Sequence, residues 1–117
     1  MLNEVSLYPK GVKRLQDCHC LDAECRTTKV HENFQARYDN FLAENIPHQV
    51  NSWYRCVKHN KEVGGMFSSF HLFGAAADMT PLGVYTLEEL AAELKKFFPI
   101  VIQYPKKHFC HVQLKYV

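Results

Sequence analysis

Hydrophobic and polar positions alternate along this chain with two different periods, and each period predicts a different element. Between Thr28 and Ile46, apolar residues recur at steps of three and four, which is typical of a helix with one buried face. Thr28 is a suitable N-cap, and Pro47 ends the helix because the residue before a proline is disfavoured in helical conformation. The predicted buried face consists of Val30, Phe34, Tyr38, Phe41, Leu42 and Ile46.

A second helix is predicted to begin after Thr86 and to end at about Phe98, before Pro99. Glu89 stands three residues after Thr86, which is the spacing of a capping box. Two lysines near the end of this helix would interact favourably with the negative, C-terminal end of its dipole. Its apolar stripe consists of Leu87, Leu90, Ala91, Leu94 and Phe98.

Shorter apolar runs between these helices predict strands, a short helix and a loop. His48 to Tyr54 is a predicted strand, with Val50, Ser52 and Tyr54 on one face. Cys56 to Val63 predicts a short helix that ends at two glycines. Met66 to Phe73 then predicts a loop, and the run A-A-A-D-M after Gly74 predicts a short buried strand.

The C-terminal part predicts a β-hairpin. Ile100 to Tyr104 is rich in branched and aromatic residues and predicts a buried strand, and residues 105–107 predict the turn. The partner strand is predicted to begin at His108 or Phe109 and to end at Tyr116. Period two divides it into a core face, with Cys110, Val112, Leu114 and Tyr116, and a cleft face, with Phe109, His111 and Gln113. The predicted fold class is therefore α+β: a small antiparallel sheet with a C-terminal hairpin, two longer helices and one short helix.

Length and charge limit the possible functions. The 117 residues correspond to a single domain, and residues 1–17 show no clear period, so we expect a loosely packed lead-in there. A net charge of +2 gives no reason to expect a nucleic-acid partner. No apolar run approaches the ~20 residues that span a membrane. Residues 1–16 lack the pattern of a signal peptide, so we expect the protein to be cytoplasmic until it is released. We also expect a monomer.

His71 and Asp78 raise the question of a shared metal ion. Ligand atoms lie ~2.0–2.2 Å from a bound zinc, so the two side chains would have to converge. In a straight helix, residues seven positions apart are separated by roughly 10 Å along the axis, and in a straight strand by more than ~20 Å. The chain must therefore reverse between them. Gly74 is placed for this reversal, because glycine adopts backbone conformations that other residues avoid.

Three sequence motifs resemble those of the hedgehog/DD-peptidase superfamily. They are S-x-Y-R, H-N-x-x-V-G-G and S-x-H-x-x-G-x-A-x-D, and the likeness covers about residues 15–116. The closest resemblance is to small zinc D-alanyl-D-alanine carboxypeptidases and phage-type endolysins. It implies one zinc ion held by His71, Asp78 and His111, the last within H-F-C-H-V-Q-L. It also implies a substrate-binding cleft on the sheet, with Ser69 at a site position.

The same resemblance suggests roles for other polar residues. Arg55, the arginine of S-x-Y-R, would bind a substrate carboxylate or stabilise the oxyanion of the reaction. Many relatives carry a carboxylate three residues before the last zinc histidine, where this chain has His108. His108 is either a general base or a turn residue, and it can reach the cleft only if it precedes the regular strand. Gln113 is an alternative residue for orienting water or substrate.

Five cysteines without a signal peptide indicate thiols or metal ligands more than a disulfide framework. Cys18, His19, Cys20 and Cys25 either pack as thiols, which we favour, or bind a second zinc.

The predicted function is hydrolysis of a D-amino-acid-containing bond in peptidoglycan stem peptides, by a carboxypeptidase or an endolysin-type endopeptidase of a phage or prophage. One alternative is a non-catalytic zinc-containing binding module of the same fold. Another is a redox or two-zinc protein built on the cysteines.

Overall fold

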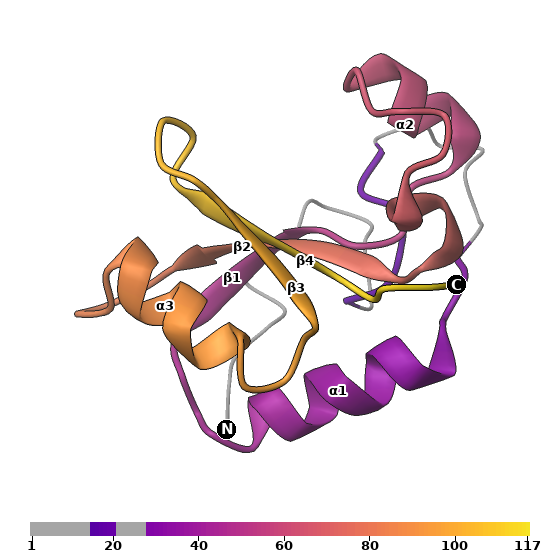
Figure 1. Cartoon of the computed structure of the whole chain (residues 1–117). Coiled ribbons are helices and arrows are strands. Elements are labelled where there is room, and N and C mark those ends of the chain that lie inside the picture. The colour runs from indigo at the N-terminus through magenta and orange to yellow at the C-terminus, as the bar shows by residue number, and fades with distance from the viewer. Residues whose placement is uncertain (1–14, 21–27) are drawn as a thin grey trace.

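The fold is centred on a four-stranded antiparallel sheet with the strand order β1-β2-β4-β3. The structure, a computed structural model, describes residues 15–20 and 28–117. Helices α1 and α3 lie on one side of the sheet and the short helix α2 on the other (Figure 1). This arrangement, with its C-terminal β3–β4 hairpin, confirms the predicted α+β class. The strands are β1 (His48–Ser52), β2 (Ala76–Pro81), β3 (Ile100–Tyr104) and β4 (Phe109–Gln113), and the helices are α1 (Glu32–Leu42), α2 (Val57–Glu62) and α3 (Leu87–Leu94).

The core lies between the sheet and helices α1 and α3. Trp53, just after β1, is fully buried, and its ring meets those of Phe34 and Tyr38 edge-on, with centroids 5.0 and 4.9 Å apart. Such aromatic pairs add to the stabilisation from apolar burial. Met79 of β2 and Leu90 of α3 are also fully buried. The helical stripes of Phe34, Tyr38, Phe41, Leu87, Leu90, Ala91 and Leu94 thus face the core as predicted.

The helix ends differ from the prediction. Helix α1 begins at Glu32 after His31, so Thr28 is not its N-cap and Val30 is 43% exposed. The Thr28 hydroxyl instead donates a hydrogen bond to the Gln16 carbonyl oxygen, a contact between distant residues that local spacing cannot reveal. The predicted capping box of α3 is present.

The lengths of the helices and the structure of the predicted loop also differ from the prediction. Helix α1 ends at Leu42, α3 at Leu94 and α2 spans Val57–Glu62, so each is shorter than predicted. The predicted loop at Met66–Phe73 contains a 3₁₀ helix, η2 (Phe70–Phe73).

The sheet differs from the prediction at three places. Strand β1 contains a β-bulge between Val50 and Ser52, so these residues oppose Met79 and Asp78 and lie on opposite faces, contrary to the prediction. Strand β3 was predicted to be buried, yet it is an edge strand whose residues from Ile102 onward are exposed. Strand β4 ends at Gln113, and Tyr116 is exposed, not in the core.

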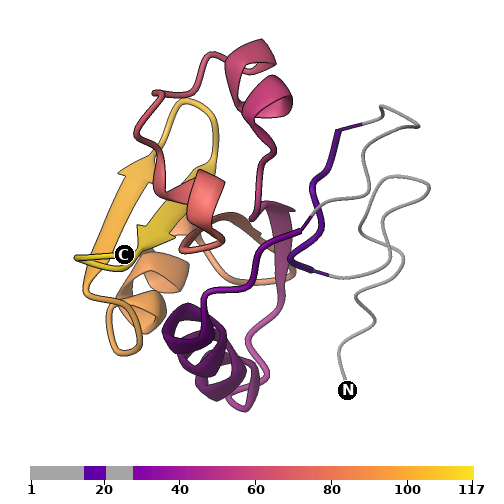
Figure 2. The ribbon, with the colours of Figure 1, turned by 90° about the vertical axis from the view of Figure 1, so that its right-hand side faces the viewer.

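Residues 15–20 lie beside β1 and the connection that follows it (Figure 2). Leu15 packs against the core, and the Gln16 side chain donates a hydrogen bond to Gln35 of α1 over 2.7 Å. Leu15 and Gln16, at the end of the lead-in predicted for residues 1–17, thus contact the rest of the fold. The remainder of that prediction, and Cys25 in the cysteine motif, lie outside the described residues. Among the described residues, no helix has the length and apolar character needed to cross a membrane.

Candidate metal centre

Asp78 and His111 are direct cross-strand neighbours on one face of the sheet. Asp78 of β2 is paired with His111 of β4 in the antiparallel register, and Ser52 of β1 is opposite Asp78 on its other side. Side chains opposite each other in adjacent strands lie within contact distance. The bulge in β1 places Ser52 in this row. Pleat and register thus bring these three polar side chains together on the face that β2 turns away from the core.

His71 reaches the same place from η2, which directly precedes β2. The Ser69 hydroxyl accepts a hydrogen bond from the His71 backbone N–H, at 3.2 Å. Gly74 ends η2 with a left-handed φ of 70°, and a Cβ there would collide with the Lys29 carbonyl, so only glycine fits this reversal. The turn predicted at Gly74 is therefore present.

The ligand atoms of His71, Asp78 and His111 all lie within 4.8 Å of one another, and we call these residues the histidine–aspartate group. Asp78 Oδ1 is 3.4 Å from His71 Nε2 and 2.9 Å from His111 Nδ1. Atoms about 2.1 Å from a tetrahedral zinc are separated by roughly 3.4 Å, so little movement is needed to bind one ion.

Both imidazoles have their other ring nitrogen hydrogen-bonded. His71 Nδ1 is 2.6 Å from the Trp53 carbonyl oxygen, and His111 Nε2 is 2.8 Å from Gln113 Oε1. A bond of this kind fixes the tautomer and aims the opposite nitrogen at the metal. Within the described residues, His71 Nε2 is buried and has no hydrogen-bond partner, which is unfavourable unless a ligand satisfies it. The group therefore fits a metal ion.

The charges of the group are coupled. Burial disfavours a charged Asp78, but the hydrogen bond from His111 and the nearby His71 imidazole, whose Nε2 is 3.4 Å from Oδ1, outweigh it and hold the pKa of this carboxyl well below its ordinary value. Burial also disfavours the charged form of His111, which by itself would lower its pKa. The hydrogen bonds of His111 with Asp78 and Gln113 raise that pKa overall. Asp78 is thus available as an anionic ligand at neutral pH.

Arg55 lies beside the group and is held by three neighbours. Its guanidinium donates hydrogen bonds to Ser52 Oγ (3.1 Å), Asn60 Oδ1 (3.0 Å) and Asp78 Oδ2 (3.2 Å). Its backbone N–H also donates to the His71 carbonyl oxygen, at 3.0 Å. Arg55 and the group therefore form one connected network, in which Asp78 binds Arg55 through Oδ2 and meets both histidines through Oδ1.

The face that carries these residues is hollowed into a cleft of about 490 Å³. Arg55, Ser69 and Gln113 line it together with the histidine–aspartate group. Its remaining lining comes from α2–η2 and from the hairpin, namely residues 63–66, 68, 70, 102, 104, 107 and 109.

His108 is the one predicted site residue that the structure does not bring to this cleft. It lies in the hairpin turn, is exposed, and has a left-handed φ of 57°. Its side chain lines a separate pocket with Thr86 and Gln103. His108 thus lies in the turn, as a general base would require, but it lines a different pocket and not the cleft. A catalytic role for His108 stays an untested prediction.

Sequence reasoning missed the residues that hold the predicted ones in place. Asn60 is 3% exposed, accepts from Arg55 and donates to the Met66 carbonyl oxygen. A Cβ on Gly65 would collide with Asn60 and come within 2.8 Å of the Arg55 guanidinium. The H-N-x-x-V-G-G motif contains both Asn60 and Gly65. Their position shortly after the candidate arginine was the sequence signal that could have identified them as residues that hold Arg55.

The fold and the site together define a class: small α+β proteins with a candidate metal site in a cleft on an antiparallel sheet. The sequence model of the family described as peptidase M15 matches residues 6–113, and the chain belongs to this family. Neither the comparison with curated proteins nor that with solved structures gives a significant match. Family membership supports a metallopeptidase that acts on a peptide substrate.

Proposed function

We propose that this protein is a zinc peptidase that hydrolyses a D-amino-acid-containing bond in peptidoglycan stem peptides. One observation carries the proposal: three ligand atoms of the histidine–aspartate group converge in a cleft of about 490 Å³. Two histidines and one carboxylate are a typical ligand set of catalytic zinc, which leaves a coordination position open. The substrate class rests on the motif resemblance.

In this proposal, His71 Nε2, His111 Nδ1 and one oxygen of Asp78 hold one zinc ion. Zinc bound in this way lowers the pKa of a water molecule to roughly 7 and polarises a substrate carbonyl. The Trp53 carbonyl and Gln113 keep the two imidazoles in the required tautomers. Gln113 and Ser69 also line the cleft, where their remaining donors and acceptors would form hydrogen bonds with the substrate.

Arg55 is proposed to bind negative charge on the substrate. A guanidinium has five N–H donors, and three of its hydrogen bonds here go to Ser52, Asn60 and Asp78, which leaves donors for the cleft. In a carboxypeptidase these donors would bind the free C-terminal carboxylate, and in an endopeptidase they would stabilise the oxyanion.

The experiment compares two substrates. The zinc-loaded protein is incubated with pentapeptide muropeptides and, separately, with cross-linked muropeptide dimers, and the products are separated by liquid chromatography and mass spectrometry. Released D-alanine indicates a carboxypeptidase, and split dimers indicate an endopeptidase. His71→Ala serves as the inactive control. No turnover of either substrate by fully loaded protein would overturn the proposal.

A non-catalytic binding module is the second candidate, and one observation favours it. Among the described residues that line the cleft, the only carboxylate and the only imidazoles are those of the histidine–aspartate group. No further side chain of either kind is there to transfer a proton. Saturable binding of muropeptides without turnover would establish this alternative.

A further inference from the structure

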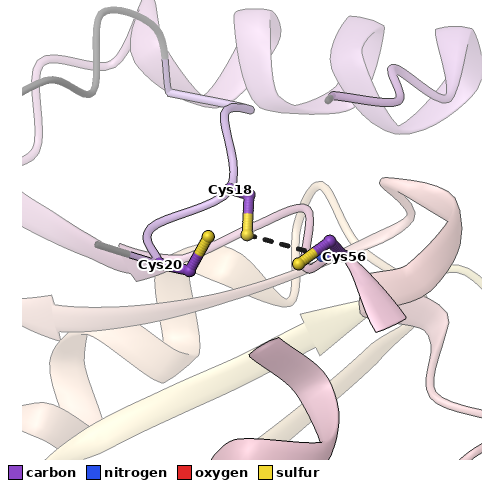
Figure 3. A group of neighbouring side chains, drawn as sticks. All are labelled: Cys18, Cys20 and Cys56. Atoms are coloured by element: carbon purple, nitrogen blue, oxygen red, sulfur yellow. Dashed lines mark hydrogen bonds between the residues drawn. The ribbon is translucent and has the colours of Figure 1, made fainter. Parts of the chain in front are cut away.

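Three cysteines from distant parts of the sequence meet beside the connection between β1 and α2. The sulfur atoms of Cys18, Cys20 and Cys56 all lie within 4.8 Å of one another, and we call these residues the cysteine group. Figure 3 shows the three sulfurs turned toward a common space. None of the three is in a disulfide.

We propose that the cysteine group binds a second zinc ion, through three thiolates. Sulfur atoms at ~2.3 Å from a tetrahedral zinc are about 3.8 Å apart, which falls within the 4.8 Å limit that the three sulfurs satisfy. Each thiol releases its proton to solvent as its sulfur binds the metal. The sequence motif alone favoured packed thiols, and its zinc alternative included Cys25, which lies outside the described residues. Cys56 is 36 positions beyond Cys20, and only the fold brings it to the other two.

Backbone N–H groups donate hydrogen bonds to two of these sulfurs. The Cys56 N–H donates to Cys18 Sγ over 3.4 Å, and the His59 N–H donates to Cys56 Sγ over 3.3 Å. Hydrogen bonds to a charged form favour that form, and donors to ligand sulfurs are typical of metal–thiolate sites. Three packed thiols without a metal would gain less from such donors.

The second ion would fix the segment that holds the cleft residues. Residues 15–20 are tied to β1 by the contact of His19 Nδ1 with the Asn51 carbonyl oxygen, at 2.7 Å. Cys56 directly follows Arg55, and the Trp53 carbonyl two residues before Arg55 orients His71. A zinc shared by Cys18, Cys20 and Cys56 would join residues 15–20 to this connection. Its role is structural support behind Arg55 and His71.

The test counts metal ions and identifies their ligands in the full chain. The zinc-loaded wild-type protein is expected to contain two zinc ions. Cobalt substitution is expected to give thiolate-to-cobalt charge-transfer absorption, which imidazole and carboxylate ligands do not produce. His71→Ala should lose one ion and keep this absorption. Because His71 lies in the other group, this result separates the second site from the catalytic proposal.

Cys56→Ser should also lose one ion, and it should lose the charge-transfer absorption. Serine is a good N-cap, so in this variant the side chain still accepts the hydrogen bond from the His59 N–H of α2, and only the sulfur is removed. Cys20→Ser is the second variant, in case Cys56→Ser folds poorly. Cys110→Ser is the matched control, because Cys110 is buried elsewhere with its thiol directed at the Leu87 carbonyl. It should keep both ions and the absorption.

Either of two results would overturn the proposal. One is a wild-type protein with a single zinc and five titratable thiols, which would make the cysteine group packed thiols only. The other is a single zinc with a mass two hydrogens lower, which would show a disulfide. Retention of two zinc ions and full charge-transfer absorption by both Cys56→Ser and Cys20→Ser would overturn the assignment of the ligands.

Discussion

The histidine–aspartate group and the cysteine group each hold three ligand atoms within the same 4.8 Å, but their chemistry and surroundings differ. The first offers two imidazoles and a carboxylate from η2, β2 and β4, and it lines a cleft. The second offers three sulfurs from residues 15–20 and from the start of α2. Sulfur-rich sets are typical of structural zinc, and mixed nitrogen–oxygen sets with an open position are typical of catalytic zinc. The two ligand sets thus support two different functions.

The link between the two regions is the stretch from Trp53 to Cys56. Trp53 orients His71 through its carbonyl, Arg55 binds Asp78, and Cys56 belongs to the cysteine group. A change in one region can therefore reach the other through a few peptide bonds. Activity and metal content must be measured together to separate them.

Removing a ligand from the cleft should have the largest effect. His71→Ala is expected to reduce peptidase activity to the background level, because it removes a proposed zinc ligand and leaves Asp78 and His111 alone. Activity on muropeptides and zinc content by mass spectrometry check this result. If the variant kept full zinc content and full activity, His71 would not be a ligand, and the histidine–aspartate group would not be a metal site.

Arg55→Ala should cost activity without costing metal. We expect a loss of about 10²–10³-fold in kcat, the range for removing a donor that stabilises an oxyanion. The zinc content should stay unchanged, because Asp78 binds Arg55 through Oδ2 and faces the histidines through Oδ1. Arg55→Lys is the matched variant: it keeps the charge but replaces the planar, five-donor guanidinium with a compact ammonium. A wild-type rate in Arg55→Ala would remove its proposed role.

Thiol chemistry should separate the cysteine group from the core cysteine. Burial raises the pKa of Cys110 to about 11, so its thiolate fraction at pH 8 is more than about 100-fold below that of an ordinary thiol. Iodoacetamide at pH 8 should therefore spare Cys110 with or without zinc. Chelation should expose Cys20 and Cys56, which are half-buried, to alkylation. Peptide mapping reads each site, and equal labelling of Cys20 and Cys56 before and after chelation would argue against a metal there.

Gln113→Ala should weaken the first metal site alone. Loss of a residue that orients a metal-ligating histidine typically costs about 10–100-fold in metal affinity or activity. Gln113 holds His111 Nε2, and among the described residues its side chain hydrogen-bonds to His111 and to the Leu114 carbonyl oxygen, not to the cysteine group. Competition with a zinc indicator should show one weakened and one unchanged site. Equal weakening of both sites would mean that the two regions are coupled more tightly than the contacts suggest.

Local patterns predicted most of the fold. The Thr86 capping box, the glycine reversal at Gly74 and the alternation of Cys110, His111 and Val112 in β4 are all properties of neighbouring residues, and the structure has them. Patterns of this kind fix helices, turns and strand faces. They cannot fix events that depend on distant partners.

The failures arose from such distant partners. The bulge at β1, which depends on pairing with β2, moves Ser52 to the cleft face. The meeting of Cys56 with Cys18 and Cys20 depends on how residues 15–20 cross the connection after β1. The reversal between His71 and Asp78 could be anticipated at Gly74, but His111 could be added as the third ligand only because the motifs resembled those of known peptidases.

His108→Ala should have the smallest effect. The side chain lies in the hairpin turn, exposed, and lines a pocket with Thr86 and Gln103 instead of the cleft. A general base contributes about 10²–10⁴-fold to a rate, whereas a turn residue of this kind should change it less than about threefold. Because the left-handed φ of His108 is costly for alanine, His108→Asn is the matched control, since asparagine tolerates this conformation. A loss above about 100-fold in both variants, with zinc retained, would mean that the turn moves in catalysis to bring His108 to the cleft.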